Sequence, residues 1–512
     1  MNRDIIMSGA PEVTPRDQYN KTLLANVHPP DWVNPAPAPR YNLVVIGGGT
    51  AGLVSAAGAA GLGAKVALVE RHLLGGDCLN YGCVPSKAII RSSRLVADFR
   101  DAARFGFKGP PETEVDFAAV MERMRQLRAA ISHHDSARRF RDLGVDVFLG
   151  SARFSGPRTV EAAGRTLNFS KAVIATGARA VDPMVPGLAE AGYLTNETVF
   201  SLTARPGRLL IMGGGPLGCE FAQAFQRLGC RVTLLHKYDR LMNREDADAA
   251  QLVQQVFVRE GIHLILAAKP IQILKADGGK LVRYESAGQP GEIEVDEILA
   301  GAGRAPNVEN LGLDAAGVKY DPREGVVVND RLQTTNRRIY AAGDVCLHYK
   351  FTHMADATAR IVIQNALFLG RKKVSALTVP WCTYTDPEVA HVGINEAEAE
   401  KQGIAIQTFI KPFSEVDRAV VDGEAEGMVK IHVKQGTDRI LGATIVARHA
   451  GEMISEITLA MVGKIGLGAL AAVIHPYPTQ AEAIRQTGDL YNRTRLTPFI
   501  KKLFARFLAW RR

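Results

Sequence analysis

Long hydrophobic runs are missing from this chain of 512 residues. No stretch of eighteen or more apolar residues occurs, so the sequence predicts no transmembrane helix. The first forty residues also lack the continuous apolar core of a signal peptide, and they are polar and rich in proline. We therefore expect a cytoplasmic protein with an irregular N-terminal arm over residues 1–40.

Cysteine is scarce, with six in the whole chain, which excludes a disulfide-stabilised scaffold. Cys78 and Cys83 lie five residues apart, whereas the other four are scattered. No second cysteine or histidine pair lies close enough in sequence to complete a zinc site, so we expect no bound structural metal. This distribution suits a reducing compartment and one local redox device.

A basic stripe interleaved with aromatic residues is also absent, although the net charge is +9. Six basic residues and no acidic ones lie in the segment Thr494–Arg512, so most of the excess charge belongs to the C-terminal tail. Nucleic acid is therefore not an expected partner.

What the chain does have is a pair of glycine-rich loops, each between a strand and a helix. The strand Tyr41–Ile46 leads into the first loop, and a second strand, Lys65–Val69, ends in Glu70. The loop glycines are Gly47, Gly49 and Gly52. They permit a tight turn and close approach of the backbone to a pyrophosphate, while Glu70 can bind ribose hydroxyls. This βαβ unit predicts a dinucleotide site.

The second loop follows the strand Arg208–Met212 and contains Gly213, Gly215 and Gly218. His236 occupies the place of Glu70, and Lys237 and Arg240 follow it. A carboxylate here would repel a 2′-phosphate, whereas a basic cluster can neutralise one, which favours NADPH over NADH. The alternative is a solvated basic loop that accepts either cofactor.

A third strand runs into a Gly343-Asp344 turn, which places a carboxylate at the carboxyl edge of a sheet, where doubly wound folds bind ligands. From Val379 to about Asn492 strands alternate with a helix, as in an α+β domain. The expected fold class is α/β, with two Rossmann-like dinucleotide-binding domains and a C-terminal α+β domain.

The cysteine pair belongs to the segment Gly75–Lys87, which begins five residues after Glu70. Two thiols separated by four residues near the start of a helix can close a disulfide, and the helix dipole favours the thiolate. We expect this segment to be redox-active.

The segment resembles the G-G-x-C-x4-C-x-P-S-K signature of the pyridine nucleotide-disulfide oxidoreductases, of the glutathione reductase, dihydrolipoyl dehydrogenase and mercuric reductase type. The resemblance covers essentially all of residues 41–492. It implies a glutathione reductase-like fold and a homodimer. The implied domains are FAD-binding over 41–186 and 306–376, NAD(P)H-binding over 187–305, and dimerisation over 377–493, followed by a tail helix over 494–512.

The resemblance also implies roles for individual residues. Cys78 would exchange with substrate, Cys83 would contact the flavin as the charge-transfer thiolate, and Lys87 and Glu220 would pair near flavin N5. Further FAD contacts are expected at Gly76, Thr176, Gly177, Gly343 and Asp344. Further NAD(P)H contacts are expected at Gly303 and Arg304.

The C-terminal segment departs from the family pattern. A histidine five residues before Glu482 would serve the partner subunit as general acid/base, but that position is Tyr477. A phenol, with an ordinary pKa near ~10, is a poor base at neutral pH. His475 lies two residues earlier and either reaches the site or is an ordinary packed histidine.

Tyrosine at this position is similar to mercuric reductases, yet those enzymes also carry a C-terminal cysteine pair, and no cysteine follows Cys382 here. Pro216 replaces the aromatic gate that several members place over the flavin. The residues therefore predict an NADPH-dependent reductase whose acceptor is a metal ion, such as copper(II), or a small disulfide. The alternatives are a dihydrolipoyl dehydrogenase, a membrane-peripheral NAD(P)H:quinone oxidoreductase and a non-enzymatic flavin-binding module.

The tail predicts an amphipathic helix beginning at Pro498 with Thr497 as its cap. Its apolar face consists of Phe499, Ile500, Leu503, Phe504, Phe507 and Leu508, opposite Lys501, Lys502 and Arg506. The helix either lies on an anionic membrane at the inner face or packs against the enzyme body, for which a dimer offers ample apolar surface.

Overall fold

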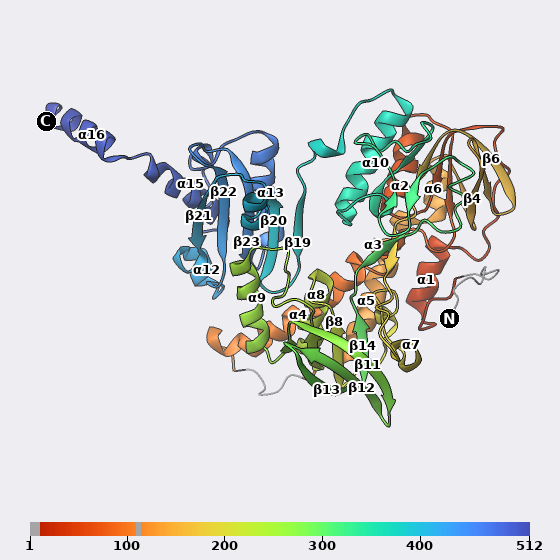
Figure 1. The fold of residues 1–512 in the computed structure, drawn as a ribbon, viewed down its shortest axis with the longest axis horizontal. Coiled ribbons are helices and arrows are strands. Elements are labelled where there is room, and N and C mark those ends of the chain that lie inside the picture. The colour runs from red at the N-terminus through yellow and green to blue at the C-terminus, as the bar shows by residue number, and fades with distance from the viewer. Residues whose placement is uncertain (1–10, 109–113) are drawn as a thin grey trace.

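The computed structural model describes residues 11–108 and 114–512. It confirms the expected α/β class, with one mixed and one parallel sheet and a separate C-terminal α+β domain (Figure 1). In the described ranges no helix is long and apolar enough to cross a membrane.

The first sheet has five parallel strands, β1 (Tyr41–Ile46), β2 (Val66–Glu70), β3 (Val145–Leu149), β6 (Arg165–Ile174) and β18 (Ile339–Ala341), in the order β3-β2-β1-β6-β18. The strands β4 (Ala152–Gly156) and β5 (Thr159–Ala162) extend β6 in antiparallel fashion. All five residues of β2 are buried because the sheet is covered on both faces. The helix α2 (Thr50–Gly61) packs against α10 (Thr352–Leu367), where Gly58 leaves room for Ile363.

Two helices carry the cysteine pair between β2 and β3. Cys78 lies within α3 (Gly76–Asn80), and Cys83 is the first residue of α4 (Cys83–Asp101). The helix α4 packs against α5 (Phe117–Ile131) and against α8 of the second sheet. A short helix, α6 (Ala137–Asp142), then leads into β3.

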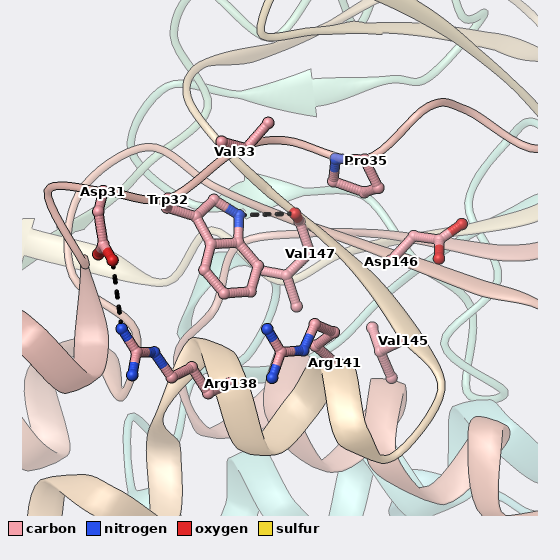
Figure 2. A pocket seen from close by; sticks show the side chains of 9 residues that line it. All are labelled: Asp31, Trp32, Val33, Pro35, Arg138, Arg141, Val145, Asp146 and Val147. Atoms are coloured by element: carbon pink, nitrogen blue, oxygen red, sulfur yellow. Dashed lines mark hydrogen bonds and ion pairs between the residues drawn. The ribbon is translucent and has the colours of Figure 1, made fainter.

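The sequence predicted an irregular N-terminal arm. This prediction was wrong for part of the arm, which contains the helix α1 (Gln18–Val27). Residues 1–10 lie outside the described residues. Leu23 and Val27 are fully buried in the core of the first domain, and this burial stabilises the helix. The chain then crosses the edge of β3, where the indole of Trp32 donates a hydrogen bond of 3.2 Å to the carbonyl of Val147 (Figure 2).

The second sheet is parallel, with the order β10-β9-β8-β14. Its strands are β8 (Arg208–Met212), β9 (Arg231–Leu235), β10 (His263–Ile265) and β14 (Glu297–Ala300), flanked by α8 (Pro216–Arg227) and α9 (Ala247–Arg259). An antiparallel sheet of β11 (Ala268–Ala276), β12 (Gly279–Ser286) and β13 (Gln289–Val295) adjoins it. Two connecting strands, β7 (Ala178–Ala180) and β15 (Arg304–Pro306), pair with each other where the chain passes between the nucleotide units.

The C-terminal domain is an antiparallel sheet in the order β19-β20-β23-β22-β21. Its strands are β19 (Pro380–Thr383), β20 (Glu388–Gly393), β21 (Ile406–Pro412), β22 (Met428–Lys434) and β23 (Ile440–Ala447). The helices are α11 (Glu396–Lys401), α12 (Asp417–Val421), α13 (Ala450–Val462), α14 (Leu467–Leu470) and α15 (Glu482–Thr494).

Buried polar contacts tie this domain to the second nucleotide unit. Lys430, which is almost completely buried, lies 2.5 Å from a carboxylate oxygen of Asp248 and 3.7 Å from one of Asp246. Beside them, the Trp381 indole donates a 2.7 Å hydrogen bond to the buried carboxylate of Glu245.

The last helix, α16 (Pro498–Trp510), begins after the expected Thr497 cap, whose hydroxyl accepts a hydrogen bond from the Ile500 amide. Figure 1 shows this helix standing away from the rest of the molecule at the end of α15. None of its residues is buried, so within one chain it does not pack against the enzyme body.

Candidate active site

The two cysteines of the predicted redox segment are both free thiols, and they hydrogen-bond to each other. Cys83 begins a helix of 19 residues, where the positive end of the helix dipole favours a negative sulfur. Its Sγ also lies 3.3 Å from the hydroxyl of Thr352, the first residue of α10. The sulfur of Cys83 is therefore surrounded by groups that stabilise a thiolate.

A partly buried ion pair lies beside the thiols. Lys87, one turn along α4, places its Nζ 2.9 Å from a carboxylate oxygen of Glu220 on α8. The other oxygen of Glu220 accepts a 2.9 Å hydrogen bond from the amide of Tyr384, and the Lys87 ammonium lies 4.4 Å above the Tyr384 ring. The structure thus brings together two residues that are 133 positions apart in the sequence.

These contacts shift the pKa values of the two thiols in opposite directions. The hydrogen bond from Cys78 lowers the pKa of Cys83, and Thr352 and the charge of Lys87 lower it further, against the opposing effect of burial. The same hydrogen bond and burial raise the pKa of Cys78. Burial alone would lower the pKa of Lys87, but its contact with Glu220 raises it, so Lys87 stays cationic. The arrangement favours a thiolate at Cys83 and a thiol at Cys78.

The first glycine loop forms a tight cradle next to this pair. A Cβ on Gly52 would lie 1.8 Å from the carbonyl oxygen of Gly47, and one on Gly76 would lie 2.7 Å from the Cα of Gly49. The helix α2 starts with no side-chain cap, so its first amides are left for an anion. The loop fits the pyrophosphate of a dinucleotide. Glu70, at the end of β2, accepts 2.6 Å hydrogen bonds from the amides of Gly48 and His72.

The remaining residues predicted to contact FAD lie at the same edge of the first sheet. Thr176 donates a 2.7 Å hydrogen bond to the carbonyl of Asn307, and Gly177 and Gly343 have positive φ angles of 67° and 78°. Asp344 lies 3.6 Å from the guanidinium of Arg304. Arg304 also forms a close ion pair with Asp77, so it links the redox segment to the Gly343-Asp344 turn. Gly303 beside it is exposed.

The second glycine loop is built like the first, with His236 in place of the glutamate. Gly213 and Gly218 make the same close approach, because a Cβ on Gly218 would lie 1.8 Å from the carbonyl oxygen of Gly213. His236 Nδ1 accepts a 2.8 Å hydrogen bond from the amide of Gly214, while its Nε2 is buried with no partner in the described chain. The space around Gly215 is open, so the loop fits a nucleotide phosphate.

The basic cluster differs from the predicted one in its charges. Burial and the neighbouring Lys237 lower the pKa of His236, and its Nδ1 is an acceptor, so the ring is neutral with a proton on Nε2. Arg240 donates to the carbonyls of Asn243 and Glu245 at 3.1 and 3.4 Å. Lys237 is exposed, 4.6 Å above the ring of Tyr238. His236 thus offers a hydrogen-bond donor, and Lys237 offers an exposed positive charge.

The C-terminal residues lie away from the cysteines within one chain. Tyr477 is 70% exposed and donates a 2.8 Å hydrogen bond to Asp417. Nε2 of His475 lies 3.1 Å from a carboxylate oxygen of Glu456 in the same chain. Glu482 pairs with Arg485 at 2.6 Å instead of orienting Tyr477.

Thr352, Tyr384 and Asp77 contact the predicted site residues, but no pattern in the sequence singled them out. Thr352 carries a weak signal, since it starts the helix that follows the Gly343-Asp344 turn. A buried link from the N-terminal arm was also missed. Arg128 donates 2.9 and 2.7 Å hydrogen bonds to the Asn80 carbonyl and the Asn20 side chain, joining α1 to the helix that holds Cys78.

Comparison with known proteins agrees with this geometry. The family model described as pyridine nucleotide-disulphide oxidoreductase matches residues 41–359, and the model of its dimerisation domain matches residues 379–487. Mercuric reductase of Staphylococcus aureus is 34% identical over 445 residues, which cover 87% of this chain and 81% of the relative. Dihydrolipoyl dehydrogenase of Thermus scotoductus is 34% identical over 464 residues, which cover 88% of this chain and 98% of the relative.

Among solved structures, the Cu(II) complex of the HOCl-induced flavoprotein disulfide reductase RclA from Escherichia coli is 28% identical. Its TM-score is 0.78, and the match covers 87% of this chain and 98% of that chain. Mercuric reductases and dihydrolipoyl dehydrogenases are equally distant from this chain, so identity alone does not select the acceptor.

Proposed function

This chain belongs to the pyridine nucleotide-disulphide oxidoreductase family, and we propose that it is an NADPH-dependent reductase that passes electrons through FAD and the Cys78/Cys83 pair to a soft metal ion. It is an FAD-dependent enzyme of this family, and its C-terminal domain supports a homodimer. Copper(II) or mercury(II) is the proposed acceptor class, and a small disulfide is the alternative within the same chemistry.

The observation that carries the proposal is the asymmetry of the two thiols. Cys83 sits on a helix N-terminus beside Thr352 and near Lys87, while Cys78 is the protonated partner. Bound FAD supplies the two-electron chemistry between the nicotinamide and these sulfurs. Closing the disulfide from the Cys83 thiolate and the Cys78 thiol releases two electrons and one proton. The electrons reduce two Cu(II) ions to Cu(I) or one mercury(II) ion to the metal, and the proton passes to solvent. Thiolate sulfur is also the ligand type that soft metal ions prefer.

The C-terminal segment favours a metal ion over a disulfide. A disulfide acceptor needs a proton carrier, and Tyr477 is a phenol whose pKa is raised further by its hydrogen bond to Asp417. A metal ion needs ligands rather than a proton. In the proposed path the ion meets Cys78 and Cys83 directly. The Cu(II)-bound relative supports copper as one such ion.

The unpartnered Nε2 of His236 supports NADPH as the electron donor. A buried N–H without an acceptor costs about 1–3 kcal/mol, and a 2′-phosphate would satisfy it. Lys237, exposed beside it, adds a positive charge for the same group. NADH remains the alternative donor, since a ribose hydroxyl also accepts a hydrogen bond.

Anaerobic NADPH oxidation by the FAD-loaded enzyme tests the proposal, with cupric and mercuric ions compared against lipoamide and glutathione disulfide. We expect turnover with a metal ion that Cys78→Ser abolishes. Cys230→Ala, at a buried thiol in the second nucleotide domain, is the matched control and should keep the activity. Turnover with disulfides alone would make Tyr477 or His475 the proton carrier and overturn the metal acceptor. Quinone reduction that survives Cys78→Ser would instead show that the cysteines are not on the electron path.

A further inference from the structure

The tail helix α16 is an amphipathic helix with nothing packed against its apolar face. Phe499, Leu503, Phe507 and Trp510 are 75%, 53%, 49% and 80% exposed. Within the described residues, its hydrogen bonds stay inside the tail and it makes no ion pair with the body. A helix face with several neighbouring exposed apolar side chains marks an interaction site.

The opposite face and the ends of the helix carry only positive charge. Lys501, Lys502 and Arg506 lie on the polar face, and Arg495, Arg511 and Arg512 flank the helix. No acidic residue occurs between Thr494 and Arg512. The segment therefore complements a negatively charged surface that also offers an apolar layer.

The helix is too short to be stable by itself. Helices shorter than about 12–15 residues are marginal in water unless an apolar face is buried, and α16 has 13 residues and buries none of them. Its Thr497 cap and its proline at the first turn favour helix initiation, but they do not cover the apolar face. A surface that receives that face would complete the fold of this segment.

We propose that α16 binds the surface of a bilayer containing anionic lipid and lies parallel to it. The apolar side chains would enter the acyl boundary, with Trp510 at the headgroup level, and the lysines and arginines would contact lipid phosphates. A length of roughly 20 Å is too short to cross the hydrocarbon core, so the helix lies on the membrane. A second copy of α16 is disfavoured as the occupant, because each tail carries the same strong positive charge.

Flotation of the FAD-loaded enzyme with vesicles tests this inference. The vesicles contain phosphatidylcholine alone or phosphatidylcholine mixed with phosphatidylglycerol, at low and high salt. We expect binding to the anionic vesicles, weakened by salt and about tenfold or more stronger than binding to the neutral ones. Leu503→Ser with Phe507→Ser should reduce binding about tenfold, and so should Lys501→Gln with Lys502→Gln and Arg506→Gln. Ala505→Ser with Ala509→Ser, on the polar face, is the matched control and should bind like the parent chain.

The reductase activity with a water-soluble acceptor should be the same in all four proteins, because the tail lies outside the redox site. Absence of binding by the parent chain would overturn the proposal, as would equal binding to neutral and anionic vesicles. If Leu503→Ser with Phe507→Ser lowers the oligomeric mass by light scattering and leaves flotation unchanged, the occupant of the apolar face is a second copy.

Discussion

His236 Nδ1 accepts a 2.8 Å hydrogen bond from the amide of Gly214. Glu70 makes the corresponding contact with the amide of Gly48 at 2.6 Å in the first loop. The two loops therefore use an acid and an imidazole for the same structural task. The difference is what each presents to the nucleotide, since the carboxylate of Glu70 is an acceptor and the free Nε2 of His236 is a donor.

His236→Glu should reverse the preference between the two nicotinamide cofactors. The carboxylate can still accept from Gly214, but it would repel a 2′-phosphate, so we expect the KM for NADPH to rise about tenfold or more. The KM for NADH should change less. Steady-state kinetics with both cofactors measure this, with the exposed His263→Glu of the same domain as control. Equal changes in both KM values would show that His236 does not read the phosphate.

Lys87→Met should raise the pKa of Cys83 and slow turnover. The hydrogen bond from Cys78 and the Thr352 hydroxyl remain, but the nearby positive charge that favours the thiolate is lost. Thiolate absorbance of the reduced enzyme against pH should show a titration midpoint at higher pH, and turnover should fall by roughly tenfold or more. Arg91→Met, at an exposed position on α4, should leave the midpoint in place. An unchanged midpoint in Lys87→Met would remove Lys87 from the thiolate environment.

Glu245→Gln should flatten the dependence of stability on pH. Burial raises the pKa of Glu245 from 4.5 to about 7, against the stabilising hydrogen bond from Trp381. A carboxyl group whose pKa is raised by folding stabilises the fold fully at pH values below its pKa in the unfolded chain. This contribution is lost as the pH rises through about 7. The amide cannot ionise, so between pH 5 and 8 the variant should avoid a loss of up to about 3 kcal/mol. Urea unfolding across this range measures it, with the exposed Glu400→Gln as control.

Arg128→Met should destabilise the redox segment through the N-terminal arm. Arg128 is 2% exposed, and its loss leaves the Asn80 carbonyl and the Asn20 side chain without their buried donor. We expect the free energy of unfolding to fall by about 2–4 kcal/mol. Arg138→Met provides the contrast, because its ion pair with Asp31 is exposed (Figure 2) and should contribute less than about 1 kcal/mol. Equal losses would mean that the link from α1 to Asn80 carries no special stability.

The sequence by itself was enough to predict the fold class, both glycine loops and the redox segment. These features are local, because a strand, a turn and a helix in succession leave a readable pattern of apolar residues and glycines over about thirty residues. Strands β1 and β8 have the predicted bounds for this reason. The N-terminal arm was the exception, since α1 is ordered by burial of Leu23 and Val27 in a core built from later segments.

Only the tertiary structure decided how the site residues meet. The contact of Thr352 with Cys83 joins residues 269 positions apart, and no spacing rule links them. The neutral state of His236 depends on its burial and on the direction of one backbone amide. Neither can be seen from the presence of basic residues in the sequence. Likewise, the amphipathic pattern of α16 was visible in the sequence. Only the structure shows that its apolar face does not contact the body of the same chain. Contacts of this kind arise from packing between distant elements, and for that reason they follow from the fold rather than from local pattern.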